Sequence, residues 1–216
     1  MRPLISKAYN FDPLIRHANW LKLQASNSSL LPSLLFLTDE ARTPDPLSTV
    51  RMLPRGTAVI FRHYTDRNRN TLARELRREC RSRNLPFIIA GGGALASDVA
   101  ADGIHLPQWQ IPEIIKYKRN KRIHFITAAV HDLPSLIKAA NLGASALLAA
   151  PVFPTASHLN RPHLGVSGLA ALAHTIPAPV YALGGITARN SSQILGTGAA
   201  GIAGIGMFLM AGGRND

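Results

Sequence analysis

The sequence has one cysteine, no secretion signal and no long apolar run, and each absence excludes a class of protein. Cys80 alone cannot form an internal disulfide or a cysteine-based zinc site. The N-terminal residues show neither the apolar core nor the small-residue cleavage site of a signal peptide. The uncharged stretch 196–213 is rich in glycine, whereas a spanning helix needs about 20 mostly apolar residues. We therefore expect a cytoplasmic protein with no membrane partner.

Acidic clusters and common catalytic motifs are missing as well. No close pair of carboxylates stands where strands are expected to end, which argues against glycosidase chemistry. No group of Asp and Glu offers a magnesium cage, and neither a GxSxG elbow nor a Walker-type loop occurs. The residues themselves therefore predict no metal and no cofactor.

Positive charge, in contrast, is in surplus. The chain has 24 Lys and Arg against 12 Asp and Glu, a formal charge of +12, which attracts anions at long range. Much of the surplus falls in 74–83 and 116–122, on or at the end of expected helices, without the interleaved aromatic residues that stack on bases. We interpret these segments as solvent-exposed helix faces, which makes a nucleic-acid partner the weaker alternative.

Eight short apolar runs alternate with helix-like segments along a chain of 216 residues. Strands buried on both faces read as continuous apolar runs, and alternation with helices implies parallel pairing through right-handed crossovers. The expected strands are 34–38, 57–62, 87–90, 103–106, 125–130, 146–150, 180–183 and 201–205. The expected helices between them are 45–53, 70–83, 94–100, 112–118, 133–141, 166–174 and 188–195.

This pattern predicts an α/β fold, a single (β/α)8 TIM barrel over residues 31–216. The amphipathic stretch 11–23 predicts an extra N-terminal helix within an extension over residues 1–30. The chain is short for the fold, so the last helix is expected to be truncated. Working residues of such barrels lie at the C-terminal ends of strands and in the loops that follow.

Glycines after the last two expected strands predict a phosphate site. Gly184 and Gly185 follow one strand, just before Thr187 is expected to open a helix, and Gly204 and Gly206 close the next strand. Glycines let backbone N–H groups approach a phosphate, and a helix N-terminus adds partial positive charge. The alternative is that these glycines only make tight turns and close the barrel.

Three further side chains stand at predicted strand ends. Arg62 ends an apolar strand, where its charge calls for an anion or an ion-pair partner. His131 precedes Asp132, a residue suited to cap the next helix, and its imidazole is either an acid/base or a surface group. His105, inside a strand, is either a hydrogen-bonded core residue or part of the site.

Seven segments together are similar to one known family. FLTDE, VIFRHYT, AADGIHLP, AAVHD, GASALLAAPVFPTASH, VYALGGIT and GAAGIAGI follow one another between residues 34 and 208. Their order and spacing resemble the thiamin phosphate synthase and TenI-like superfamily over nearly the whole barrel. The segments ADGIHL, PVFPT and ALGGIT are the most specific in combination.

The resemblance implies a synthase that joins a thiazole phosphate to a pyrimidine pyrophosphate and displaces pyrophosphate with the help of magnesium. The sequence departs from that pattern at several positions. Only Arg62 remains of the motif Q-L-R-E-K. Ala90 and Gly91 replace the Asn-Asp whose acid binds magnesium. Gln110 replaces a second acid, and His158 stands for a lysine. Loss of both carboxylates should weaken magnesium binding, since this ion prefers oxygen ligands of hard character.

The tautomerase branch of the family is the better match. That branch also lacks the magnesium acids, tends to have Leu-Pro where this chain has Leu106 and Pro107, and carries a histidine that matches His131. The resemblance implies that His131 shuttles a proton to aromatise a thiazole carboxylate phosphate. The substrate-binding residues would then be Arg62, His105, Thr155, His158, Gly184, Gly185, Gly204 and Gly206.

The leading hypothesis is therefore a thiazole tautomerase of thiamin biosynthesis that works without a metal. Its partner would be a small phosphorylated thiazole, and a homo-oligomer is compatible with the sequence. Two alternatives stay open. One is a thiamin phosphate synthase with altered magnesium ligands, and the other is a barrel that binds the phosphate without turnover.

Overall fold

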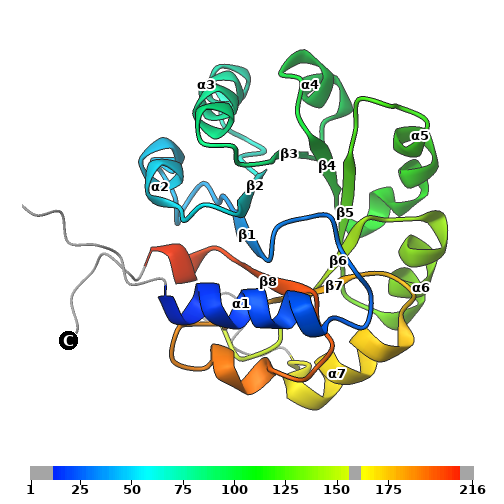
Figure 1. Ribbon diagram of the computed structural model, residues 1–216. Coiled ribbons are helices and arrows are strands. Elements are labelled where there is room, and N and C mark those ends of the chain that lie inside the picture. Colours follow the sequence, from blue (N-terminus) through cyan, green and yellow to red (C-terminus); the bar gives the residue numbers. More distant parts are fainter. Residues whose placement is uncertain (1–11, 156–161, 210–216) are drawn as a thin grey trace, which may run out of the picture.

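The computed structural model describes residues 12–155 and 162–209, which form a closed barrel of eight parallel strands (Figure 1). Each strand pairs with the next along the chain, and the last pairs with the first. The predicted (β/α)8 fold is thus confirmed, and every strand lies within one residue of its expected bounds. The strands are β1 (Leu34–Leu37), β2 (Thr57–Phe61), β3 (Phe87–Ala90), β4 (Gly103–Leu106), β5 (Phe125–Val130), β6 (Ala146–Ala149), β7 (Val180–Leu183) and β8 (Gly201–Gly204).

Six α-helices surround the first seven strands as an outer ring (Figure 1). Two begin at caps visible in the sequence, since Asp45 and Asp132 accept the N–H groups of Ser48 and Ser135. Among the described residues no helix is both long and apolar enough to cross a membrane. The helices are α2 (Pro46–Met52), α3 (Arg69–Ser82), α4 (Gly93–Asp98), α5 (Ile114–Lys118), α6 (Leu133–Leu142) and α7 (Gly165–Thr175).

The helix expected over 188–195 is wrong. Only the 3-10 turn η3 (Ser191–Ile194) forms there, because the Asn190 side chain accepts the Thr187 N–H (2.8 Å) and donates to the Gly185 carbonyl (2.8 Å). These bonds close the chain into a tight turn and compete with a helix. The helix expected over 112–118 begins earlier and is divided into the 3-10 turn η1 (Gln108–Glu113) and α5.

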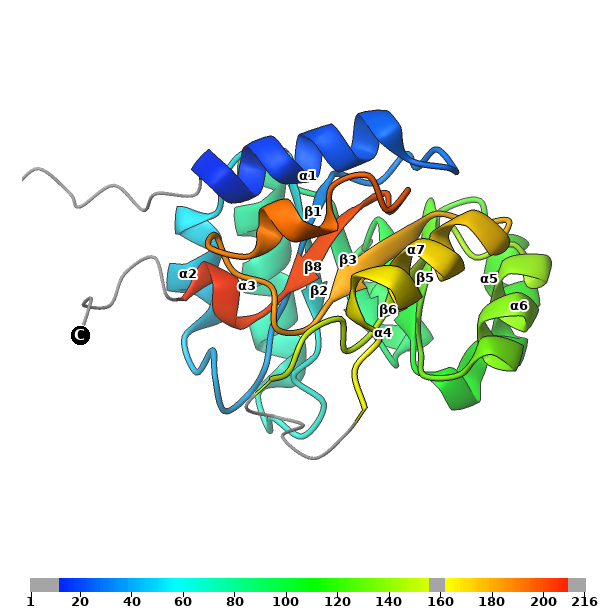
Figure 2. The ribbon, with the colours of Figure 1, turned by 90° about the horizontal axis from the view of Figure 1, so that it is seen from below.

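The amphipathic N-terminal stretch is confirmed as helix α1 (Asp12–Gln24), which lies along β8 (Figures 1 and 2). Leu14, Ala18 and Leu21 are buried in the same core as the strands. In the described part of the chain β8 is followed only by the 3-10 turn η4 (Gly206–Phe208), so α1 covers a strand that has no α-helix of its own. The expected last helix falls largely outside the described residues.

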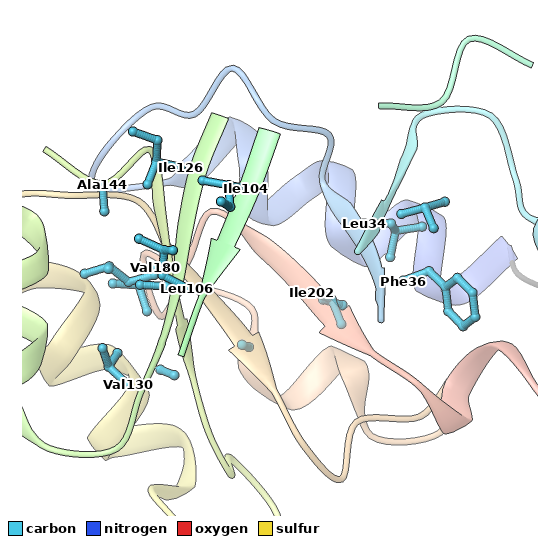
Figure 3. Close-up of a cluster of buried hydrophobic side chains, with 14 of the residues drawn as sticks. Leu34, Phe36, Ile104, Leu106, Ile126, Val130, Ala144, Val180 and Ile202 are labelled. Atoms are coloured by element: carbon cyan, nitrogen blue, oxygen red, sulfur yellow. The ribbon is translucent and has the colours of Figure 1, made fainter. Parts of the chain in front are cut away.

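Strand side chains alternate between two apolar layers. One layer, with Leu35, Ile60 and Leu148, fills the barrel interior. The other, with Phe36 and Val130, packs under the helices, and Figure 3 shows part of it. Because the two layers are distinguished residue by residue, the alternation also indicates which polar side chains at the strand ends face the barrel interior.

One ion pair on the outside of the barrel is expected to contribute strongly to stability. Asp102 receives two hydrogen bonds from Arg77 (2.7 and 3.0 Å) and one from the Phe87 N–H (2.8 Å), and the Arg77 side chain is only 15% exposed. Breaking a largely buried pair leaves a charge without its partner. Asp102→Asn should therefore lower the free energy of unfolding by about 2–4 kcal/mol.

The matched control is Asp98→Asn, which breaks the Arg74–Asp98 pair (2.7 Å) between side chains that are 55% and 47% exposed. Exposed pairs contribute about 0–1 kcal/mol. Urea unfolding of both variants measures the difference. Equal losses in the two variants would contradict a structural role for Asp102.

Candidate active site at the barrel mouth

Polar side chains from β1, β2, β4 and β5, or from the residues just after them, face the barrel interior near its C-terminal mouth. Side chains two residues apart along a strand face the same side of the sheet. Leu37 and Ile60 face the interior, so Asp39 and Arg62, which come just after β1 and β2, lie on the inner side as well. Arg62 Nη2 lies 3.5 Å from Asp39 Oδ2, and the two side chains are 27% and 19% exposed. Arg42 binds the same oxygen at 3.0 Å and, more than any other cause, its hydrogen bond lowers the pKa of Asp39. The Asp39 carboxylate is thus charged and held by two guanidinium groups.

His105 lies beside this pair in the barrel interior. Its Nδ1 is 2.8 Å from the Thr127 hydroxyl, and both side chains are buried. Burial, helped by the nearby charge of Arg62, lowers the pKa of His105 to about 3. The imidazole is therefore neutral at physiological pH. We call Asp39, Arg62, His105 and Thr127 the inner mouth.

The glycine loops form a second group at the mouth. Gly184 and Gly185 adopt φ of 96° and 70°, and the Thr155 methyl lies beside Gly184. None of the hydrogen bonds formed among the described residues uses the N–H groups of Gly184, Gly185 or Gly206, and all three residues keep some exposure to solvent. Consecutive N–H groups in such backbone form a concave site suited to an anion.

Two details of the predicted phosphate site differ in the structure. Gly204 is buried, and a Cβ there would meet the Met207 sulfur at 2.9 Å, so this glycine serves close packing. The expected helix at Thr187 is absent, and its N–H is bonded to Asn190. Of the predicted phosphate site, three glycine N–H groups remain available to an anion, and no helix dipole follows β7.

His131 is exposed, and among the described residues no hydrogen bond links its side chain to either group. Its N–H donates to Gln108 Oε1 (2.8 Å), and Gln108 in turn donates to Asp132. The residue lines a groove of about 550 Å³ between η1 and α6, and no other predicted site residue lines that groove. The remaining lining residues are Gln108, Trp109, Ile111, Pro112, Ser135 and Lys138. His158 lies outside the described residues.

The structure also reveals a polar cluster built around Arg69, a residue that the sequence prediction missed. Arg69, the first residue of α3, donates to the carbonyl oxygens of His63 and Ala90 (2.6 Å to Ala90) and lies over the Phe61 ring at 5.3 Å. His63 is buried and hydrogen-bonded to Thr38 (2.9 Å). An arginine at the start of a polar helix gives no signal in the sequence that its side chain reaches the strand ends. Thr38 and His63 follow strands, and that position was their only sequence signal.

The residues present do not fit a magnesium site. Among the described residues no three His, Cys, Asp or Glu side chains come together to hold a metal. Asp39 is the carboxylate of the inner mouth, and its oxygens already bind Arg42 and Arg62. Ala90 and Gly91, which stand where the resemblance places a magnesium acid, offer no side-chain oxygen.

Several known proteins are similar to this chain in sequence or in fold. The thiamine-phosphate synthase of Levilactobacillus brevis is 34% identical over 163 residues, which cover 71% of this chain and 75% of that protein. The thiamine-phosphate synthase of Bacillus mycoides is 28% identical over 199 residues, 87% of this chain and 90% of that protein. Among solved structures, thiamine phosphate pyrophosphorylase from Pyrococcus furiosus is 29% identical with a TM-score of 0.67, covering 81% of this chain and 85% of the other.

A sequence model of one family covers most of the barrel. The model described as thiamine monophosphate synthase matches residues 34–208, from the start of β1 to the end of η4. This range is the one over which the segments of the sequence resemble the same family. By this match the chain belongs to the thiamine monophosphate synthase family, and its role lies in thiamin biosynthesis.

Proposed function

We propose that the protein is a thiamine-phosphate synthase, which joins a thiazole phosphate to a pyrimidine pyrophosphate at the barrel mouth. The observation that carries this proposal is the presence of two separate elements suited to anions, Arg62 after β2 and the loops of Gly184, Gly185 and Gly206 after β7 and β8. Only β1 lies between β2 and β8. Two strand spacings are roughly 10 Å, which suits two phosphorylated substrates bound side by side.

The relatives support the same choice and favour it over the tautomerase that was the leading hypothesis from the sequence. The relatives compared above carry the name of the synthase or pyrophosphorylase. His131, on which the tautomerase hypothesis depends, lines the groove between η1 and α6, and no residue of the inner mouth lines that groove.

The residues have distinct tasks in the proposed reaction. The glycine N–H groups bind the phosphate of the thiazole and fix its position. The thiazole forms a bond to the carbon that carries the pyrophosphate as the bond from that carbon to the pyrophosphate oxygen breaks, so negative charge builds on the departing group. The Arg62 guanidinium stabilises that charge, since a fixed positive group near a developing anion lowers the barrier. His105 stays neutral beside it.

The direct test is product formation from the two substrates, followed by mass spectrometry, with and without Mg²⁺. Arg62→Gln should slow the coupling by about 10²-fold or more, because one stabilising charge is removed from the transition state. Arg51→Gln is the matched control, since Arg51 pairs with Glu79 on the surface. Absence of product from the wild-type protein under both conditions would refute the synthase proposal.

Thiazole tautomerase is the second candidate, and one observation favours it. An exposed imidazole follows β5 at His131, while no carboxylate follows β3. A tautomerisation needs one acid/base group and no metal. If this candidate is correct, thiazole carboxylate phosphate will be converted and His131→Ala will slow the conversion by about 10²-fold. In a synthase the same substitution leaves coupling unchanged. Binding without either turnover would indicate a non-catalytic barrel.

A further inference from the structure

A guanidinium group occupies the point where β2 and β3 end. Arg69 reaches there from the start of α3 and donates to the carbonyl oxygens of His63 and Ala90. The rings of Phe61 and Tyr64 flank it at 5.3 and 5.4 Å. These contacts fix the group, and half-burial lowers its pKa, although an arginine keeps its charge at neutral pH.

This positive charge opposes a metal ion at the same point. Strand-end carbonyl oxygens are ligands that a divalent cation accepts, but Arg69 already uses those of His63 and Ala90. A divalent cation would also meet the repulsion of the guanidinium at short range. The adjoining residues Gly91 and Gly92 are partly exposed and offer no side chain that compensates.

Two carboxylates of this region have hydrogen-bond partners other than Arg69, although the charge of Glu40 still acts on Arg69. Asp39 is shared by Arg42 and Arg62, and Glu40 is bound by the Thr65 hydroxyl and N–H. Arg69 forms no ion pair with a carboxylate among the described residues. Two of its five N–H groups are used by carbonyl oxygens, so donors remain for an anion.

We infer that Arg62 and Arg69 hold the pyrophosphate group of the second substrate directly and that this chain binds it without a divalent cation. The inference rests on the proposed function, since it assigns the site of one of its substrates. Guanidinium groups bind phosphate oxygens in paired hydrogen bonds and supply the neutralising charge that a metal would otherwise bring. Arg69 is then a substrate-binding residue.

The test is isothermal titration of inorganic pyrophosphate into the full-length protein, once with excess EDTA and once with Mg²⁺. The dissociation constants should agree within about twofold, and Arg69→Gln should weaken binding about tenfold or more, the loss expected for one charge-assisted contact. Arg69→Lys keeps the charge without the forked geometry and should fall between the two. Arg74→Gln is the control, because Arg74 lies on the exposed side of the helix that Arg69 begins and pairs with Asp98 of α4.

Folding is checked by thermal unfolding, and the lysine variant serves if the glutamine variant is unstable. The inference would be overturned if pyrophosphate bound only in the presence of Mg²⁺, or if wild type and Arg69→Gln bound it with equal affinity. If the protein still coupled the two substrates, the proposed function would stand. Metal-independent, Arg69-dependent binding together with a blank coupling assay would have the opposite meaning. The metal-free pyrophosphate site at Arg69 would then stand without this substrate assigned to it, and the synthase proposal would fail.

Discussion

Gly185→Ala is expected to lower the affinity for thiazole phosphate by about 10²-fold, because it displaces the loop that would hold the phosphate. At φ of 70° an added Cβ would lie 2.6 Å from the Pro154 carbonyl oxygen and 2.7 Å from Phe153 Cβ. Real Cβ atoms do not approach so closely, so the loop after β7 or the loop after β6 must move. The displaced N–H groups could then no longer converge on one anion.

The matched control for this prediction is Gly196→Ala. Gly196 has a similar positive φ of 78°, but its added Cβ would meet no atom within 4 Å. Both substitutions therefore carry the cost of a left-handed alanine, roughly 1 kcal/mol, and only Gly185→Ala adds the collision. Titration calorimetry with thiazole phosphate and thermal unfolding of both variants separate the two contributions.

Unchanged affinity in Gly185→Ala, with a stability loss equal to that of Gly196→Ala, would mean that the loop tolerates the methyl group. The phosphate site would then have to lie elsewhere. Gly206→Ala refines the assignment, because an added Cβ there meets nothing within 4 Å and the substitution should leave the fold intact. A loss of affinity in that variant would therefore come from contact between the added methyl group and the ligand, and not from a change in the fold.

The barrel itself could be predicted because its strands carry a strong local signal. Runs such as Leu34–Leu37 and Phe87–Ala90 are buried on both faces, so nearly every position is apolar and the run ends where burial ends. Helix starts at Asp45 and Asp132 were equally local, since one side chain makes the cap. The helix expected after β7 failed because Asn190 forms a turn with residues on either side, a competition that periodicity does not reveal.

The candidate site was predicted only where a strand end sufficed to locate it. Arg62 and His105 come directly after or within strands, so the fold alone brings them to the inner mouth. Arg69 belongs to a helix and reaches the strand ends through contacts with the His63 and Ala90 carbonyl oxygens, which are distant from one another in sequence. The backbone N–H of His131 is bound by Gln108, a residue of η1, and no pattern around His131 specifies that bond.

His105 makes the stability of the barrel depend on pH in a predictable way. Its pKa is about 3 in the folded protein against an ordinary value of 6.5, mainly because burial disfavours the charged imidazole. The unfolded chain therefore takes up a proton below pH 6.5 that the folded chain refuses, and stability present above pH 6.5 is lost as the pH falls toward 3. Each pH unit in this window costs up to about 1.4 kcal/mol.

Urea unfolding at pH 6.5 and pH 4.5 should then differ by about 2–3 kcal/mol on account of this one residue. Asp39 and Asp45, whose pKa values are lowered from 3.8, lose stability mainly below this window, and Glu40, whose pKa is lowered from 4.5, adds a loss of the same sign at its lower edge. His63, whose pKa is also lowered by burial, contributes a loss of the same sign.

His105→Gln is the variant that isolates the effect. Glutamine can keep a hydrogen bond to the Thr127 hydroxyl but cannot take up a proton, so most of the difference between pH 6.5 and 4.5 should disappear and the His63 share should remain. The variant is compared with itself at two pH values, so any stability lost through repacking cancels. A pH dependence as steep as that of the wild type would show that His105 can be protonated in the folded barrel. The inner mouth would then be open to water, and the assignment of His105 as a neutral neighbour of Arg62 would have to be abandoned.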